Sequence, residues 1–142
     1  MNLLGGCLCG TVRFGVTEHP TLALHCHCSI CRRAHGAAFG TFTVVKQENF
    51  AWTKGELMLG TYASSPGFKR QFCRQCGSHL IVLGAWNPTG ITIVLAALDD
   101  VSGLKPSCHI FTGSKAAWHE ITDSLPQYEE WPPGLGPSVP KK

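Results

Sequence analysis

The spacing of its cysteines constrains this chain most, because seven of them fall in three tight groups. The groups are Cys7-Leu-Cys9, Cys26-His-Cys28-Ser-Ile-Cys31 and Cys73-Arg-Gln-Cys76. A disulfide within such a group would enclose almost no chain and would constrain little of the unfolded state. The same spacing lets several thiolates converge on one ion, as in zinc sites. The pattern therefore favours metal sites over a disulfide framework. Free thiols of this kind are typical of a reducing compartment, so we expect a cytoplasmic protein.

Length and charge limit the remaining possibilities. The 142 residues suit a single domain, and no apolar run approaches the roughly 20 residues of a membrane span, so we expect no membrane partner. The formal net charge of +3 is too small to indicate a nucleic-acid partner. The charges of seven metal-bound thiolates and two zinc ions would reduce even this excess to zero.

The rest of the sequence is typical of short β-strands separated by turn residues such as Gly5-Gly6. The runs rich in β-branched and aromatic residues are Thr11–Val16, Thr21–His25, Phe39–Lys46, Leu57–Ala63, Lys69–Phe72, Leu80–Leu83 and Ile91–Leu98. They predict an all-β fold of small layered sheets, with one or two short helices at Ser29–His35 and Lys115–Ile121. The Pro- and Gly-rich stretch from Trp131 has little to bury, so we expect a folded domain over residues 1–131 and a flexible tail over 132–142.

Cys73 and Cys76 stand between two predicted strands, which places them at a hairpin tip where Gly77 permits a tight turn. A thioredoxin-like redox pair has the same spacing, but it would begin a helix, and the β pattern that follows argues against it. Two sulfurs leave a tetrahedral zinc site half complete. Cys7 and Cys9 can complete it, because residues two apart in an extended segment point to the same side. Such a closed set leaves no position for a substrate, so we expect a structural zinc.

Cys26, Cys28 and Cys31 form a different kind of site. Three protein ligands with one open position are typical of catalytic zinc. In the alternative interpretation, a nearby histidine (His25, His27 or His35) fills the fourth position and the site is structural. Three thiolates favour another soft ligand, and zinc lowers the pKa of a bound thiol, so an open site indicates chemistry on a small thiol.

Other polar residues near these groups have two interpretations each. His27 is either a general base near a substrate thiol or a residue bonded to the backbone of the turn. The arginines beside the cysteines either bind substrate carboxylates or only offset thiolate charge; they are Arg32, Arg33, Arg70 and Arg74. Cys108 stands alone and is expected to be a small buried hydrophobe.

Six stretches together resemble a known family. They are Gly6–Phe14, Cys26–Arg32, Arg70–Ser78 and the later residues His109-Ile-Phe, Ser114–Trp118 and Asp123–Tyr128. This order resembles the glutathione-dependent formaldehyde-activating enzyme family, which also includes centromere protein V. The resemblance covers roughly residues 3–131. His35 departs from the pattern, since a small hydroxyl residue is expected there, and adds a potential ligand or base.

The resemblance implies a β-tent fold of small antiparallel sheets around two zinc ions per chain. It implies a structural zinc on Cys7, Cys9, Cys73 and Cys76, and a second zinc on Cys26, Cys28 and Cys31. It also implies a carbon–sulfur lyase reaction in which glutathione adds to formaldehyde to give S-hydroxymethylglutathione.

We therefore expect a zinc-dependent carbon–sulfur lyase that acts on an adduct of a small thiol such as glutathione. The expected catalytic residues are Cys26, Cys28, Cys31 and His27. The alternative is a non-catalytic zinc module that binds a protein or a nucleic acid. The family's centromere-associated members and the arginines near the cysteines support it.

Overall fold

Two β-sheets and one short helix form the fold in the computed structural model, which describes residues 2–136. The strands within that range are β1 (Leu3–Gly6), β2 (Arg13–Val16), β3 (Ala23–Cys26), β4 (Gly40–Lys46), β5 (Phe50–Lys54), β6 (Leu59–Ser65), β7 (Phe68–Cys73), β8 (His79–Gly84), β9 (Gly90–Val94) and β10 (His109–Ile110). The helix α1 (Ser29–His35) directly follows β3 and ends at Gly36. Short 3-10 turns cover Gln47–Asn49, Glu56–Met58, Leu95–Ala97 and Thr112–Ser114.

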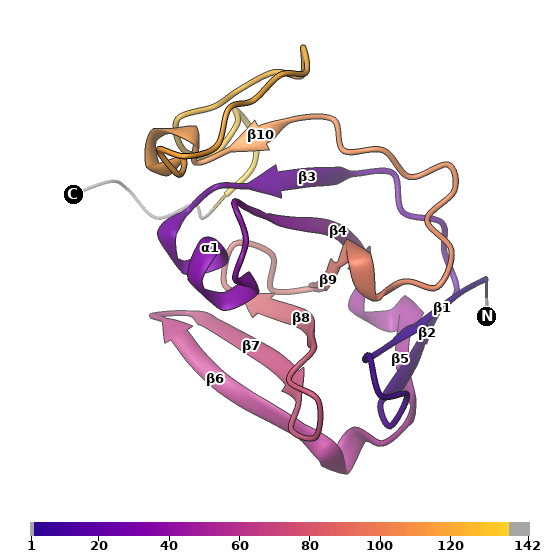
Figure 1. The fold of residues 1–142 in the computed structure, drawn as a ribbon. Helices are drawn as coiled ribbons and strands as arrows, with labels where there is room; N and C mark the ends of the chain where they lie inside the picture. Colours follow the sequence, from indigo (N-terminus) through magenta and orange to yellow (C-terminus); the bar gives the residue numbers. More distant parts are fainter. Residues whose placement is uncertain (1, 137–142) are drawn as a thin grey trace.

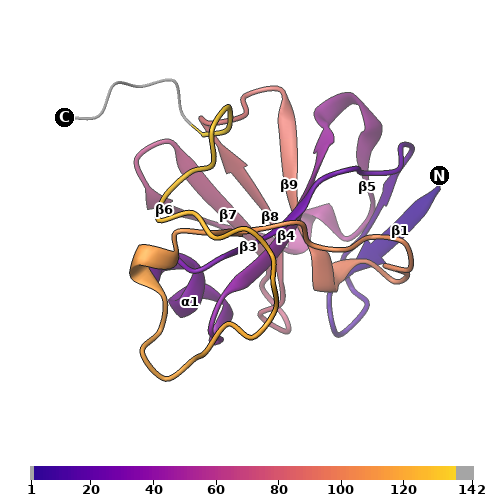
Figure 2. The same cartoon turned by 90° about the horizontal axis from the view of Figure 1, so that it is seen from above.

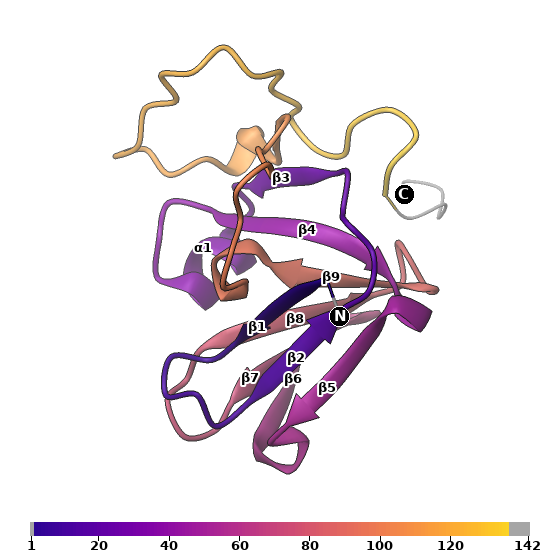
Figure 3. The ribbon, with the colours of Figure 1, turned by 90° about the vertical axis from the view of Figure 1, so that its right-hand side faces the viewer.

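The smaller sheet has the order β1-β2-β5, and the larger has the order β10-β3-β4-β9-β8-β7-β6. All pairings are antiparallel except that β10 runs parallel to β3. Figures 1 and 3 show the small sheet beside one face of the large one. The main core fills the space between them, where Phe14 and Val12 of the N-terminal region pack with Leu80 and Ile93 of the large sheet. Burial of these side chains supplies the driving force for joining the two sheets.

The second face of the large sheet has its own hydrophobic cluster, in which Leu24, Phe42, Val82 and Ile110 pack with Cys26 and Cys31. The helix α1 and the segment after β10 flank this cluster. Seen from above, that segment lies along the β10–β3 edge (Figure 2). Its backbone is fixed there by bonds from His109 N to Pro126 O and from Tyr128 N to His109 O, both 2.9 Å.

The all-β prediction is confirmed, and so is the helix Ser29–His35. Each of the seven predicted runs overlaps an observed strand, although Ile91–Leu98 changes to a 3-10 turn after Val94. The strands β1, β5 and β10 were not predicted. Gly5 and Gly6, which were predicted as a turn, lie in β1. A Cβ atom on Gly5 would lie 2.4 Å from Cζ of Phe14, so the absence of a side chain allows the close packing.

The predicted helix Lys115–Ile121 is wrong, because the segment forms turns after the 3-10 turn Thr112–Ser114. Phe111 before it has φ +56°, which a continuing right-handed helix does not allow. The N–H groups of Phe111 and Thr112 instead bond to the carbonyls of Glu130 and Tyr128. Tertiary hydrogen bonding thus overrides the local helix preference of this stretch.

The expected tail is described only in part, since residues 137–142 lie outside the described range. Trp131, where that stretch begins, packs against Trp86 and Phe111 with both ring-centroid distances at 5.4 Å. Pro132 after it is buried. Within residues 2–136, no helix has the length and apolar character to cross a bilayer.

Candidate metal centres and an adjoining pocket

The fold brings Cys7, Cys9, Cys73 and Cys76 together, with all four sulfurs within 4.8 Å of one another. Cys73 ends β7 and the turn to β8 carries Cys76, with Gly77 at φ +79°. Cys7 and Cys9 come from the loop between β1 and β2. The group therefore links the small sheet to the large one at a hairpin tip, as the spacing of the cysteines predicted.

The geometry of these four sulfurs fits zinc. The distance from Cys7 Sγ to Cys9 Sγ is 3.6 Å, and that from Cys9 Sγ to Cys73 Sγ is 3.9 Å. Zn–S bonds of about 2.3 Å give a tetrahedron with an edge of about 3.8 Å. Hydrogen bonds from Ser78 lower the pKa of Cys76 to about 5, which favours the thiolate that a metal requires.

Cys26, Cys28 and Cys31 form the second group, and their three sulfurs also lie within 4.8 Å of one another. Cys26 ends β3, Cys28 is the N-cap of α1, and Cys31 lies in its first turn. The Cys31 N–H donates to Cys28 Sγ at 3.3 Å. Hydrogen bonds from the Cys26 and Cys31 thiols hold the pKa of Cys28 well below its usual range, so one thiolate forms readily even without a metal.

Among the described residues, no histidine nitrogen or carboxylate joins these three sulfurs. The interpretation in which a histidine fills the fourth position therefore finds no ligand in this structure. The donor set is one of three soft thiolates with an open position, which suits zinc. The two groups together offer seven sulfur ligands for metal ions.

Arg70 is a charged side chain in contact with the second group. It projects from β7, is only 6% exposed, and donates from Nη2 to Cys31 Sγ at 3.4 Å and from Nε to Ser64 Oγ at 3.2 Å. Its Nη1 group is buried and has no hydrogen-bond partner in the described structure. Arg74, by contrast, donates to the carbonyl of Leu57 at the surface. Arg70 therefore adds a compensating positive charge beside the thiolates.

A pocket of about 240 Å³ adjoins the second group. All three of its cysteines line this pocket. Its other walls come from the sheet face that carries Leu24 and Phe42 and from the aromatic side chains Trp86, Phe111 and Trp131. The C-terminal segment, which contributes Trp131, thus completes a cavity that begins at β3. The pocket wall from this segment was not predicted, because the stretch from Trp131 was assigned to a tail.

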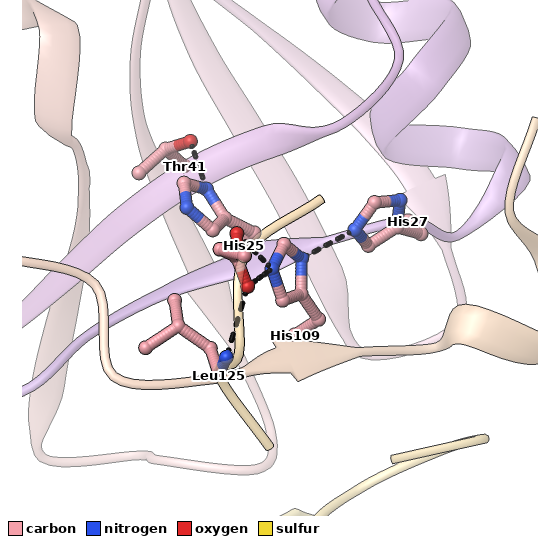
Figure 4. A network of polar contacts seen from close by, with 6 residues as sticks. His25, His27, Thr41, His109 and Leu125 are labelled. Atoms are coloured by element: carbon pink, nitrogen blue, oxygen red, sulfur yellow. Dashed lines mark hydrogen bonds and ion pairs between the residues drawn. The ribbon is translucent and has the colours of Figure 1, made fainter. Parts of the chain in front are cut away.

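His27 lies in a different environment, as Figure 4 shows. Side chains alternate along an extended segment, so His25 and His27 point away from the face that carries Cys26. His27 is fully buried, and its Nε2 lies 2.8 Å from Nδ1 of His109. His109 Nε2 contacts the Asp123 carboxylate at 3.0 Å. His27 is not among the residues that line the pocket.

This arrangement fixes the protons of the two imidazoles. The Asp123 carboxylate can only accept, so His109 carries its hydrogen on Nε2, and its Nδ1 accepts from His27 Nε2. His27 Nδ1 is left without a partner. Burial, together with His109 and His119, lowers the pKa of His27 to about 4, so the ring is neutral at physiological pH. Asp123 and His109 were not predicted as functional; their presence in the family-like stretches was the only signal.

Within the described residues, His25, His35 and Cys108 are not members of the three-sulfur group. His25 bonds to Thr41 Oγ1 at 2.8 Å. His35 packs its ring against Phe42 and His79. Cys108 is buried in the second hydrophobic cluster, as expected for a small apolar side chain.

Fold and site define a β-sheet protein with one closed four-cysteine group and one open three-cysteine group beside an apolar pocket. Residues 2–114 match the glutathione-dependent formaldehyde-activating enzyme family. The chain belongs to this family and is an enzyme of that type.

Individual relatives agree with this assignment. A Halomonas elongata protein that carries the family's name is 31% identical over 129 residues, covering 85% of this chain and 82% of its own. An uncharacterized lyase of Schizosaccharomyces pombe is 29% identical over 122 residues, covering 75% of this chain and 83% of its own. A crystal structure of a Rhodobacter sphaeroides protein superimposes with a TM-score of 0.60 at 26% identity, covering 72% of this chain and 91% of that one.

Proposed function

We propose that this enzyme makes and breaks the carbon–sulfur bond between a small thiol and an aldehyde, as in the adduct of glutathione with formaldehyde. One observation carries the proposal: three cysteine sulfurs with no fourth protein ligand among the described residues line a pocket. The names of the family and of the Halomonas relative support glutathione as the thiol.

We assign the two cysteine groups different roles. Cys7, Cys9, Cys73 and Cys76 would hold a structural zinc, because four sulfurs complete its coordination. Cys26, Cys28 and Cys31 would hold a second zinc. Bound there, zinc would lower the pKa of an incoming thiol and so supply a thiolate at neutral pH.

The reaction itself requires a thiolate and a carbonyl carbon in contact. The thiolate sulfur donates an electron pair to the carbonyl carbon, the carbonyl π pair moves to oxygen, and that oxygen takes a proton to give the hydroxyalkyl thioether. Cleavage reverses each movement and returns thiol and aldehyde. Arg70 supports this chemistry electrostatically, since its buried guanidinium offsets the negative charge gathered at Cys31.

The sequence-based assignment of His27 as general base is not retained in this proposal. Its Nε2 is bonded to His109, and His27 does not line the pocket that Cys26 lines. Proton transfer to the adduct oxygen is left to solvent water, which reaches the pocket through its opening.

Exchange NMR of glutathione with formaldehyde, with and without the zinc-loaded enzyme, tests the proposal. We expect exchange faster than the spontaneous reaction, and we expect Cys28→Ser to return it to the spontaneous rate. An unchanged exchange rate with fully loaded enzyme contradicts the formaldehyde reaction. A steeply salt-dependent affinity for nucleic acid would instead favour the binding-module alternative.

A further inference from the structure

The pocket beside the three sulfurs is much more apolar than formaldehyde or glutathione requires. Apart from the cysteines, Arg70 is the only side chain that can carry a charge among the described residues that line it. Glutathione carries two carboxylates and an ammonium group, so its charged ends find at most one partner here. Formaldehyde has no apolar substituent that could use the aromatic walls.

The volume of the pocket also exceeds the needs of a one-carbon aldehyde. A dry cavity of about 150 Å³ is sufficient to bind benzene, whereas this pocket holds about 240 Å³. Trp86 and Trp131 stand against each other at one side, with Phe111 edge-on to Trp131. Binding to these aromatic rings is most favourable for a ligand that buries an aromatic or branched aliphatic group against them.

Arg70 lies at the cysteine end of the pocket, and two hydroxyl side chains, those of Ser65 and Thr92, also line it. Cys26, Cys28 and Cys31 line the pocket there, and Arg70 contacts Cys31 with Nη2 while its Nη1 has no partner in the described structure. The cysteines and Arg70 therefore favour one orientation for a ligand with one polar end and one apolar end. Its carbonyl or hydroxyl would face the cysteines, and its hydrocarbon part would face Phe42 and the tryptophans.

From this geometry we infer that the carbonyl substrate is an aldehyde with an aromatic or branched aliphatic substituent, whose apolar part fills the pocket while the thiol's charged ends stay outside. This inference rests on the proposed function and specifies its substrate class. The bond changes are those given above: one C–S bond forms, the C=O π bond is lost, and the oxygen gains the proton that the thiol gave up.

The test compares benzaldehyde with formaldehyde, each with glutathione, by exchange NMR on the zinc-loaded enzyme. We expect the acceleration over the spontaneous rate to be at least roughly tenfold greater for benzaldehyde, as is typical of discrimination by a hydrophobic pocket. Fluorine NMR of para-fluorobenzyl alcohol gives a readout that does not depend on catalysis. Its resonance should broaden or shift with the enzyme present.

Val44→Phe provides the decisive variant, because Val44 is half-buried at the pocket wall and a phenyl ring there occupies the pocket. Val101→Phe is the matched control, since Val101 is 40% exposed and does not line the pocket. We expect Val44→Phe to lower the benzaldehyde-to-formaldehyde ratio and to abolish binding of the fluorinated alcohol, while Val101→Phe changes neither. Melting curves of both variants check that they are folded.

The possible outcomes separate the two proposals. Faster exchange of formaldehyde, without benzaldehyde acceleration or alcohol binding, overturns the substrate class and leaves the proposed function standing. No acceleration with either aldehyde overturns the proposed function, and the substrate class falls with it. A benzaldehyde preference that Val44→Phe leaves unchanged also overturns the pocket assignment.

Discussion

Arg70 donates a hydrogen bond from Nη2 to Sγ of Cys31 at 3.4 Å, inside a cluster where the arginine itself is 6% exposed. A buried guanidinium requires a negative partner, because an unpaired buried charge is strongly unfavourable. The three-cysteine group supplies that partner. The three cysteines lie at the end of β3 and the start of α1, whereas Arg70 lies on β7. The contact therefore couples the protonation of the cysteines to a residue of a third element.

Replacing Arg70 by Met should weaken metal binding at the three-cysteine group by roughly 10- to 100-fold, the range seen for residues that support metal ligands. The compensating charge is lost while most of the side-chain volume is kept. Zinc release followed with a colorimetric chelator measures the effect. Arg74→Met is the control, because the side chain of Arg74 bonds only to the carbonyl of Leu57 in the described structure. Equal zinc release from the two variants would contradict the role of Arg70.

The two cysteine groups should respond differently to the same substitution. Cys73→Ser removes a fully buried sulfur that joins the two sheets, so we expect loss of the cooperative unfolding transition. Cys28→Ser keeps an N-cap oxygen for α1, so we expect a folded protein with about one zinc per chain in place of about two. Metal analysis and thermal melts by circular dichroism measure both. If the variants unfold alike, the division into structural and catalytic sites is wrong.

Asp123→Ala should lower the unfolding temperature by a few degrees without changing the zinc content. The carboxylate accepts from the buried His109 ring and from the Leu125 N–H. Asp100→Ala is a matched control, since Asp100 also accepts a backbone N–H two residues later, that of Ser102, but contacts no histidine. The difference between the two melting temperatures isolates the contact with His109. No difference would show that this contact adds nothing to stability.

The stability of the fold should decrease with falling pH in a way that depends on His35. Burial, with His79 and Arg70 nearby, lowers its pKa to about 4. Between the ordinary value near 6.5 and this lower value, the unfolded chain binds a proton that the folded chain does not, so stability falls as pH falls. The natural chain should lose free energy of unfolding through His35 as the pH falls to 4, and His35→Phe should not. We expect this difference to be about 2 kcal/mol, after allowing for partial exposure of the ring.

Denaturant unfolding at several pH values, with natural and variant chains compared at each, measures this effect. Protonation of the cysteines is common to both chains and cancels in the difference. A difference that does not change with pH would contradict the assignment to His35.

The spacing of the cysteines predicted the four-cysteine group, but the alternation assumed for Cys7 and Cys9 was wrong. The two residues lie in the turn between β1 and β2, where the Gly10 N–H bonds to the Cys7 carbonyl, and not in an extended segment. Alternation does separate His27 from Cys26, since the two are neighbours in an extended stretch. The pocket is different. It depends on Trp131 meeting Trp86 and Phe111 across the fold, and no local period encodes such a contact.

The strand β10 illustrates the same limit. It has only two residues, His109 and Ile110, too few to show a period, and it is defined by its parallel register with His25 and Cys26. That register places His109 beside His27. The chain at Phe111 and Thr112 is likewise held by backbone hydrogen bonds to Glu130 and Tyr128. Local composition does not encode these bonds, and it predicted a helix where none forms.

The contact between Cys9 and Cys73 spans 64 positions in the chain, and this separation bears on how the protein is assembled in time. Closing so long a loop has a large entropic cost before any compensating contact forms, and folds dominated by such contacts form slowly. A growing chain cannot complete the four-cysteine group until Cys76 has left the ribosome. The β1-β2 hairpin can therefore be joined to the large sheet through these sulfurs only after more than half of the 142 residues have been made.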